Sequence, residues 1–205
     1  AVGYKARYSL SSMVGNTPVF TAMQEKAGRV ARNGNHLLLQ GEPGTGKQRL
    51  AHAIHQASIR AAGPLISLKC GDIPPEVLED ELFGASENRD ESRPGKIELA
   101  NGGTLFLDEI EKVPLHVAAK LAEALKTRKL CREGEKVERD FDIRIIAACD
   151  SDLKRLTEKG VFSLDLYSIV SKSTIRIPLL RARREDIPLL AEHIIGELAQ
   201  QHNME

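Results

Sequence analysis

Short runs of apolar residues alternate along the chain with longer segments in which apolar residues recur every three or four positions. The short runs are typical of strands buried in a parallel sheet, and the longer segments are typical of amphipathic helices packed against it. The expected strands cover residues 36–40, 64–68, 104–107, 143–148 and 173–177. The expected helices cover residues 17–32, 47–60, 75–83, 114–125 and 186–200. This order predicts an α/β fold with a mainly parallel five-stranded sheet and helices on both faces.

Other segments lack such a pattern. Residues 1–12 have the character of a linker or a leading arm, so the domain itself is expected to cover residues 13–205. Residues 84–95 are polar and without periodicity, which predicts a mobile surface loop. Residues 129–141 are charged and predict a hairpin that turns at residues 133–134. Because the chain stops directly after its last expected helix, we expect it to be a piece of a longer protein.

The composition fits one cytoplasmic domain of ordinary size. Its 205 residues are 41% apolar but only 4% aromatic, which favours a core of aliphatic side chains in one α/β domain. A formal net charge of zero argues against a domain that itself wraps DNA or lies on an anionic membrane. No apolar run is long enough to span a bilayer and no secretory signal opens the chain, so we expect a cytoplasmic protein without membrane contact. The three cysteines, Cys70, Cys131 and Cys149, are far apart and are expected to be reduced thiols rather than metal ligands.

A glycine-rich turn between the first expected strand and the second expected helix matches the phosphate-binding pattern G-x-x-x-x-G-K. Its residues are Gly41, Glu42, Pro43, Gly44, Thr45, Gly46, Lys47 and Gln48. The glycines allow backbone N–H groups to point at phosphate oxygens, and the start of the helix adds the positive end of its dipole. Lys47 supplies the charge for the β- and γ-phosphates. A plain glycine turn is the other interpretation, but the spacing and both flanks favour a site for ATP or ADP.

Two acidic residues, Asp108 and Glu109, follow the third expected strand. After a phosphate loop this is the Walker B pattern, in which the first acid holds Mg²⁺ and the second polarises the attacking water. An acidic pair at a strand end is otherwise more often only solvated. Gln48 stands where a Ser or Thr hydroxyl normally faces the Mg²⁺, and its amide oxygen can still face the metal, although more weakly. We therefore expect Mg²⁺, bound together with ATP, at Asp108 and Gln48.

Four blocks in a fixed order carry a resemblance to a known family. They are residues 41–48, 81–84, 98–110 and 178–187, and the likeness runs from about residue 14 to residue 195. These blocks resemble the central AAA+ domain of sigma-54-dependent transcriptional activators, the bacterial enhancer-binding or NtrC-type regulators. The resemblance implies a P-loop AAA+ core that assembles with copies of itself, from a dimer to a hexamer, and acts on RNA polymerase. It also implies an upstream sensory domain, a helical lid and a DNA-binding helix-turn-helix beyond residue 205, and it places Val14 and Gly15 near the adenine.

The chain departs from this family at positions that carry activity there. Where the family has the GAFTGA loop that touches sigma-54, residues 85–94 are shorter, acidic and without the motif. Where the family has two arginines that act on the nucleotide of a neighbouring subunit, this chain has Ser163 and Ile169. Neither side chain can stabilise charge on a transferring phosphoryl group.

Two more substitutions fall around the acidic pair. Lys69 stands at the position of a family asparagine that restrains the Walker B glutamate, and it either pairs with Glu109 or points to solvent. Asp150 replaces the sensor asparagine after the fourth strand and puts a carboxylate near the γ-phosphate, which electrostatics disfavours. Together with the two missing arginines, these residues predict impaired catalysis at Asp108 and Glu109.

Two basic clusters have competing interpretations. His52 and His55 lie three apart on the expected P-loop helix, as a metal pair would, but a solvated helix face is favoured. Arg181, Arg183 and Arg184 form either a phosphate-binding patch or a contact between subdomains. The second is favoured because the family has a similar Arg-rich segment at the hinge to its lid.

These features predict an ATP-binding oligomerisation module of a bacterial DNA-binding transcriptional regulator, with weak or no ATP hydrolysis and without action on sigma-54 polymerase. Some members of the family lack the loop and work with the housekeeping polymerase, and this chain resembles that branch. The alternative is an active AAA+ ATPase that remodels RNA polymerase, so whether the domain is an enzyme stays open. A third interpretation is a receptor for a nucleotide second messenger.

Overall fold

A computed structural model describes residues 6–85, 93–132, 134–135 and 137–202 of the chain. Its α-helices are α1 (Pro18–Arg32), α2 (Lys47–Gln56), α3 (Pro75–Phe83), α4 (Lys96–Leu99), α5 (Leu115–Thr127), α6 (Leu153–Glu158), α7 (Leu164–Val170) and α8 (Ile187–His202). Its strands are β1 (Leu37–Gln40), β2 (Leu65–Lys69), β3 (Gly84–Ala85), β4 (Arg93–Pro94), β5 (Thr104–Asp108), β6 (Lys129–Leu130), β7 (Arg139–Asp140), β8 (Arg144–Cys149) and β9 (Thr174–Arg176).

Five of these strands form one parallel sheet in the order β2-β5-β8-β1-β9. β8 lies between β1 and β5, with Cys149 opposite Gln40 and Ala147 opposite Leu107. Because the strands are parallel, their carboxyl ends meet at one edge of the sheet, and the residues that follow β1, β5 and β8 come together there. The predicted five-stranded parallel sheet is confirmed.

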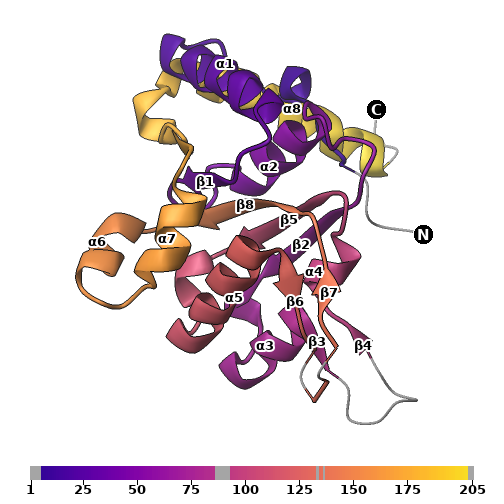
Figure 1. The fold of residues 1–205 in the computed structure, drawn as a ribbon. Coiled ribbons are helices and arrows are strands. Elements are labelled where there is room, and N and C mark those ends of the chain that lie inside the picture. The colour runs from indigo at the N-terminus through magenta and orange to yellow at the C-terminus, as the bar shows by residue number, and fades with distance from the viewer. Residues whose placement is uncertain (1–5, 86–92, 133, 136, 203–205) are drawn as a thin grey trace.

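Helices cover both faces of this sheet (Figure 1). On one face α1 and α2 enclose a cluster of buried residues that includes Phe20, while α3, α5 and α7 enclose a second cluster that includes Leu121 on the other face. Successive strand residues serve the two clusters in turn: Leu37 and Leu39 belong to the first and Leu38 to the second. A strand that is buried on both faces needs an unbroken apolar run, which is why these strands are visible in the sequence. Among the described residues, no helix combines the length and apolar character needed to cross a bilayer.

Some element boundaries differ from those that the sequence pattern predicts. The P-loop helix ends at Gln56 rather than at residue 60. Just after its end, Ser58 Oγ donates to the carbonyl oxygen of His55 in the last turn at 2.7 Å. The pattern does not predict α4, α6 and α7 at all. α6 and α7 are short, and each begins at a side chain that caps its first N–H groups, Asp152 for α6 and Ser163 for α7.

Two predicted loops are described only in part. β6 and β7 pair antiparallel, as expected for the charged hairpin, whereas residue 133 of its turn lies outside the described residues. β3 and β4 also pair antiparallel, with Ala85 opposite Arg93. Residues 86–92, which form most of the segment predicted to be mobile, lie outside the described residues.

Arg144 is buried at the start of β8, where it joins the sheet to the end of α1. Its side chain is 1% exposed, and its guanidinium donates to the carbonyl oxygens of Val30 at 2.8 Å, Ala31 at 3.0 Å and Asn35 at 2.9 Å. The bonds to Val30 and Ala31 satisfy carbonyl groups that the end of a helix leaves without partners. Burial lowers the pKa of Arg144 to about 10, so the side chain remains charged at neutral pH.

We expect the domain to lose stability below neutral pH because of His36. Burial, followed by the charges of Lys172 and Arg144, lowers the pKa of His36 from 6.5 to about 4, and its Nδ1 accepts a hydrogen bond from the Ile145 N–H at 3.0 Å. Between these two pH values the unfolded chain binds a proton at this histidine and the folded chain does not. The free energy of unfolding should therefore fall by up to about 3 kcal/mol as the pH drops through this window.

Chemical denaturation across this pH range measures the loss. His36→Asn keeps an acceptor near the Nδ1 position but does not titrate, so its stability should depend less on pH. An equally steep pH dependence in His36→Asn would contradict the assignment.

Candidate functional site

The glycine-rich turn forms a tight loop between β1 and α2. Gly44 and Gly46 have φ values of 77° and 93°, in the left-handed region where a residue with a Cβ is strained. Gly46 is the N-cap of α2 and carries no side chain that could accept from the first N–H groups of the helix. These N–H groups therefore point toward the space in front of the loop, which is the arrangement that holds phosphate oxygens at a helix start.

A cavity of about 600 Å³ lies beside this loop, between it, α1 and α8. Its volume and its largely apolar lining, which includes Leu190 of α8, suit a ligand of the size of a nucleoside. Val14, which is predicted to lie near an adenine, lines this cavity. Gly15 is not among the lining residues, but a Cβ at this position would meet the ring of Phe20 at 2.5 Å, and Phe20 does line the cavity.

Asp186 fixes the start of α8 against the start of α1, and the sequence pattern does not single it out. Its carboxylate is 1% exposed and accepts from the Asn16 N–H at 2.7 Å, the Thr17 N–H at 3.0 Å and the Thr17 hydroxyl at 2.7 Å. Burial alone would raise the pKa of Asp186, but these hydrogen bonds and the charge of Arg183 outweigh it and lower the pKa. α8 is thereby held over the cavity.

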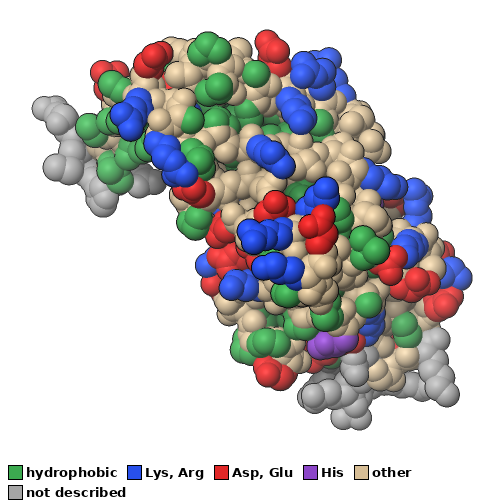
Figure 2. Space-filling model, turned by 90° about the vertical axis from the view of Figure 1, so that its left-hand side faces the viewer, with side chains coloured by type: hydrophobic (Ala, Val, Ile, Leu, Met, Phe, Trp, Pro, Cys, Tyr) green, Lys and Arg blue, Asp and Glu red, His purple; other side chains and the backbone are tan. Residues whose placement is uncertain are grey.

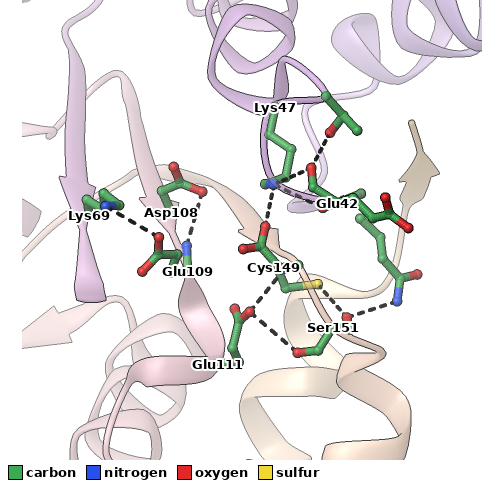
Figure 3. A network of polar contacts seen from close by, with 12 residues as sticks. Glu42, Lys47, Lys69, Asp108, Glu109, Glu111, Cys149 and Ser151 are labelled. Atoms are coloured by element: carbon green, nitrogen blue, oxygen red, sulfur yellow. Dashed lines mark hydrogen bonds and ion pairs between the residues drawn. The ribbon is translucent and has the colours of Figure 1, made fainter. Parts of the chain in front are cut away.

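Asp108 and Glu109 lie at the carboxyl end of β5, facing the loop across β8 (Figure 3). Asp108 Oδ1 accepts from the Glu109 N–H at 3.1 Å. Burial raises the pKa of Asp108, against the opposing charge of Lys47. Glu109 has a φ of 54°, a left-handed conformation that costs a non-glycine residue of order 1–2 kcal/mol and is found mainly where function requires it.

Lys69 pairs with Glu109, the first of its two predicted orientations. Lys69 Nζ lies 3.4 Å from Glu109 Oε1 and 2.7 Å from Asp72 Oδ1, while the side chain remains about half exposed (Figure 3). Glu109 also packs closely on the backbone of Gly71, where a Cβ would meet its Oε2 at 2.0 Å. The Glu109 carboxylate is thus held on the side of β2 by an ion pair and by close packing.

Asp150 reaches the P-loop lysine directly. Its carboxylate forms an ion pair with Lys47 Nζ, and its backbone N–H donates to Glu111 Oε1 at 3.0 Å. Glu111 also accepts from the Ser151 hydroxyl at 3.4 Å (Figure 3). Glu111 is a member of the site that sequence reasoning misses, although its place three residues after Asp108 is a signal that could have found it.

Of the two positions that carry arginines in the resembling family, Ser163 is the N-cap of α7 and Ile169 lies within that helix. Ser163 Oγ accepts from the Leu166 N–H at 3.3 Å and so caps this helix. Ile169 is 8% exposed and packs in the core together with Leu166 and Val170. Both residues therefore support the fold of α7, and neither offers a positive charge.

The Arg-rich segment after β9 holds the rim of the cavity. Arg181 donates to both carboxylate oxygens of Glu42, at 2.7 and 2.8 Å, and so joins this segment to the P-loop. Arg183 is 7% exposed and its guanidinium lies 4.7 Å from the centre of the Phe20 ring. Gln48, the other predicted magnesium contact besides Asp108, is exposed as the second residue of α2.

The prediction of a solvated face at His52 and His55 is wrong. His55 is 1% exposed and its Nδ1 is hydrogen-bonded to Thr104 Oγ1 at 2.8 Å. His52 is 9% exposed, and its Nδ1 accepts from the Arg7 N–H at 3.2 Å, because residues before α1 fold back over this helix. The two side chains have separate partners, and the described residues contain no group of three or more His, Cys, Asp or Glu side chains that could hold a metal ion.

Residues 13–176 match the family described as the sigma-54 interaction domain. The DNA-binding transcriptional regulator NtrC of Proteus hauseri is 39% identical over 201 residues, which cover 96% of this chain and 42% of that protein. The transcriptional regulatory protein GlrR of Escherichia coli is 39% identical over 195 residues, which cover 93% of this chain and 44% of that protein. The chain thus spans less than half the length of these relatives.

A crystal structure of NtrX from Brucella abortus in complex with ATP has the same fold. It superposes with a TM-score of 0.89 and 32% sequence identity, covering 95% of this chain and 43% of that chain. The family match extends over most of this chain. The two relatives align with nearly the whole of it. The chain therefore belongs to the sigma-54 interaction domain family.

Proposed function

We propose that this domain is the nucleotide-binding oligomerisation module of a bacterial cytoplasmic DNA-binding transcriptional regulator, in which ATP or ADP acts as a structural ligand and hydrolysis is weak or absent. One observation carries the proposal: a cavity lies beside the glycine-rich loop, whereas Ser163 and Ile169 are built into the fold around α7. The NtrX structure with ATP, and a second one with ADP, support a nucleotide as the ligand.

The loop would hold the phosphates and the cavity the nucleoside. The N–H groups at the start of α2 and the ammonium group of Lys47 supply positive charge where the phosphates lie, and Val14 and Phe20 supply an apolar wall for the base. Asp108 would hold Mg²⁺, with Gln48 as a weaker oxygen ligand. Because the described side chains form no metal site of their own, the phosphates would have to complete the coordination.

Weak hydrolysis follows from how the acidic pair is held. Lys69 draws the Glu109 carboxylate toward β2, which disfavours its use as the group that polarises water. In addition, the missing arginines leave the charge on a transferring phosphoryl group without a positive partner from the neighbouring subunit. The intact sequence of Asp108 and Glu109 favours a second candidate function, an active AAA+ ATPase that remodels RNA polymerase.

Partners follow from the family. We infer that the domain assembles with copies of itself and acts on RNA polymerase of the housekeeping type, because residues 85–94 lack the loop motif that touches sigma-54. DNA would be bound by a domain outside residues 1–205. Basic and acidic side chains are interspersed on the face drawn in Figure 2, in line with a formal net charge of zero and unlike a surface that binds DNA by its charge.

Lys47→Ala should lower the affinity for ADP and ATP at least about tenfold, because it removes the charge that the glycine-rich loop supplies for the phosphates. Isothermal titration calorimetry measures this change. Lys154→Ala removes a lysine from α6, outside the loop and its cavity, and should bind as the wild type does. Unchanged nucleotide affinity in Lys47→Ala would contradict the proposed binding site.

A further inference from the structure

The P-loop lysine already has a charged partner within this chain. Lys47 Nζ forms an ion pair with Asp150 Oδ1, and the lysine side chain is only 8% exposed (Figure 3). The same ammonium group donates to the carbonyl oxygens of Gly41 at 2.9 Å and Glu42 at 3.1 Å. An ammonium group has three N–H donors, and these three acceptors use all of them. Asp150 is the charged acceptor, and the other two are backbone carbonyl oxygens.

Asp150 is fixed at the end of a buried strand. All six residues of β8 are buried, and Asp150 follows the last of them, Cys149. The Asp150 N–H donates to Glu111 Oε1 at 3.0 Å, and the neighbouring Ser151 hydroxyl donates to the same oxygen at 3.4 Å. The backbone therefore holds the Asp150 carboxylate in front of Lys47.

The surroundings of this ion pair are already negative. Asp108 and Glu109 lie beside it at the end of β5, and Glu111 lies below it. Burial raises the pKa of Asp108, and the nearby charges of Glu109 and Asp150 raise it further. A further negative group brought to this end of the sheet would meet the same repulsion.

We propose that Asp150 makes this site selective for nucleoside diphosphates over nucleoside triphosphates. The inference rests on the proposed nucleotide site, in which the loop N–H groups and Lys47 hold the β-phosphate. The Asp150 carboxylate occupies the side of Lys47 on which a γ-phosphate would lie. A β-phosphate takes the place of one of the two carbonyl oxygens on Lys47 and leaves the ion pair of Lys47 and Asp150 intact. A γ-phosphate has to displace the carboxylate from Lys47 and then lies against its negative charge.

The consequence is a domain that is occupied mainly by the diphosphate when both nucleotides are present at the same concentration. A nucleoside diphosphate has no γ-phosphate to be hydrolysed. A preference for it therefore agrees with Ser163 and Ile169 in place of the two arginines on which hydrolysis depends in the family. An asparagine in place of Asp150 would have nearly the same shape, would carry no charge and would offer an amide donor to the γ-phosphate. Asp150→Asn therefore tests the effect of the negative charge while the shape of the side chain stays nearly the same.

The test is the ratio of the dissociation constants for ATP and ADP, measured by calorimetry on the full-length protein in EDTA, so that no divalent cation bridges the two negative groups. We expect the wild type to bind ADP at least about tenfold more tightly than ATP, and Asp150→Asn to reduce this ratio about tenfold, mainly by strengthening ATP binding. Asp152→Asn is the matched control, because it removes the same charge two residues farther along. Asp152 caps α6 by accepting from the Lys154 N–H at 3.1 Å, and asparagine caps a helix equally well, so this variant should keep the wild-type ratio.

The possible outcomes separate the two proposals. A wild-type ratio below about three, or a ratio that Asp150→Asn leaves within about threefold of the wild type, overturns the selectivity while nucleotide binding stands. An equal shift in Asp152→Asn also overturns it, because the effect would then come from net charge rather than from the contact with Lys47. If the wild type binds neither nucleotide, the proposed nucleotide site itself fails.

Discussion

ATP hydrolysis by the assembled protein is expected to be at least about 10³-fold slower than hydrolysis by family members that have arginine at both α7 positions. A factor of this size corresponds to about 4 kcal/mol of lost transition-state stabilisation. We base this expectation on two features. Ser163 and Ile169 stand where those family members have two arginines, and Lys69 pairs with Glu109, which disfavours its use in polarising water.

Steady-state turnover should be measured on full-length protein, at concentrations where oligomers form, beside a family member with both arginines. Glu109→Gln gives the background. Restoring both arginines is not a clean rescue, because Ile169 is buried in the core and an arginine there would have to bury its charge. Ser163→Arg removes a helix cap worth about 1 kcal/mol but leaves the core intact, so it is the better single variant. Family-like turnover in the wild type that Glu109→Gln abolishes would favour the active ATPase.

A second expected result is that the full-length protein forms no open complex with sigma-54 polymerase, whatever nucleotide is added. In the family this step depends on an aromatic and a threonine in the GAFTGA loop. Residues 85–94 lack both, although the base of the segment keeps its strand pair, with Gly84 opposite Pro94. The loop position is thus present in the fold, but its contact residues are not.

An open-complex assay on a sigma-54 promoter measures this directly, with a GAFTGA-containing family member as the positive control. Calorimetric binding of ADP to the same preparation shows whether the protein is folded and competent. Nucleotide-dependent opening at the sigma-54 promoter would show that the contact does not require the missing motif.

The inner strands β1, β5 and β8 were open to prediction because they are buried on both faces and so consist mostly of apolar residues. The edge strands β2 and β9 also contain exposed polar residues, such as Lys69 and Arg176. The short helices α6 and α7 were not open to prediction, since six or seven residues contain too few turns for a helical period to show. Their caps, Asp152 and Ser163, are the local signals that could have revealed them. His52 and His55 were misjudged because the residues that cover them lie before α1, and a helical pattern alone does not show what packs over it.

The parts of the site were predictable, but their contacts were not. The glycine-rich motif and the acidic pair after a strand are enough to predict Lys47, Asp108 and Glu109 from the sequence. The pairing of Lys47 with Asp150, however, joins residues 103 positions apart and depends on β8 lying beside β1. Likewise, Lys69 had two plausible orientations, and only the position of Glu109 at the end of β5 decides between them.

One measurement tests the central claim, that nucleotide binding is kept while hydrolysis is lost. Full-length protein in excess is mixed with labelled ATP and Mg²⁺, and at each time the bound label is separated and identified as ATP or ADP. We predict that the label is retained by the wild type, that retention falls in Lys47→Ala, and that the retained label stays ATP as long as it does in Glu109→Gln. Conversion of the bound ATP to ADP that is much faster in the wild type than in Glu109→Gln would contradict the claim, and so would retention that is the same in Lys47→Ala.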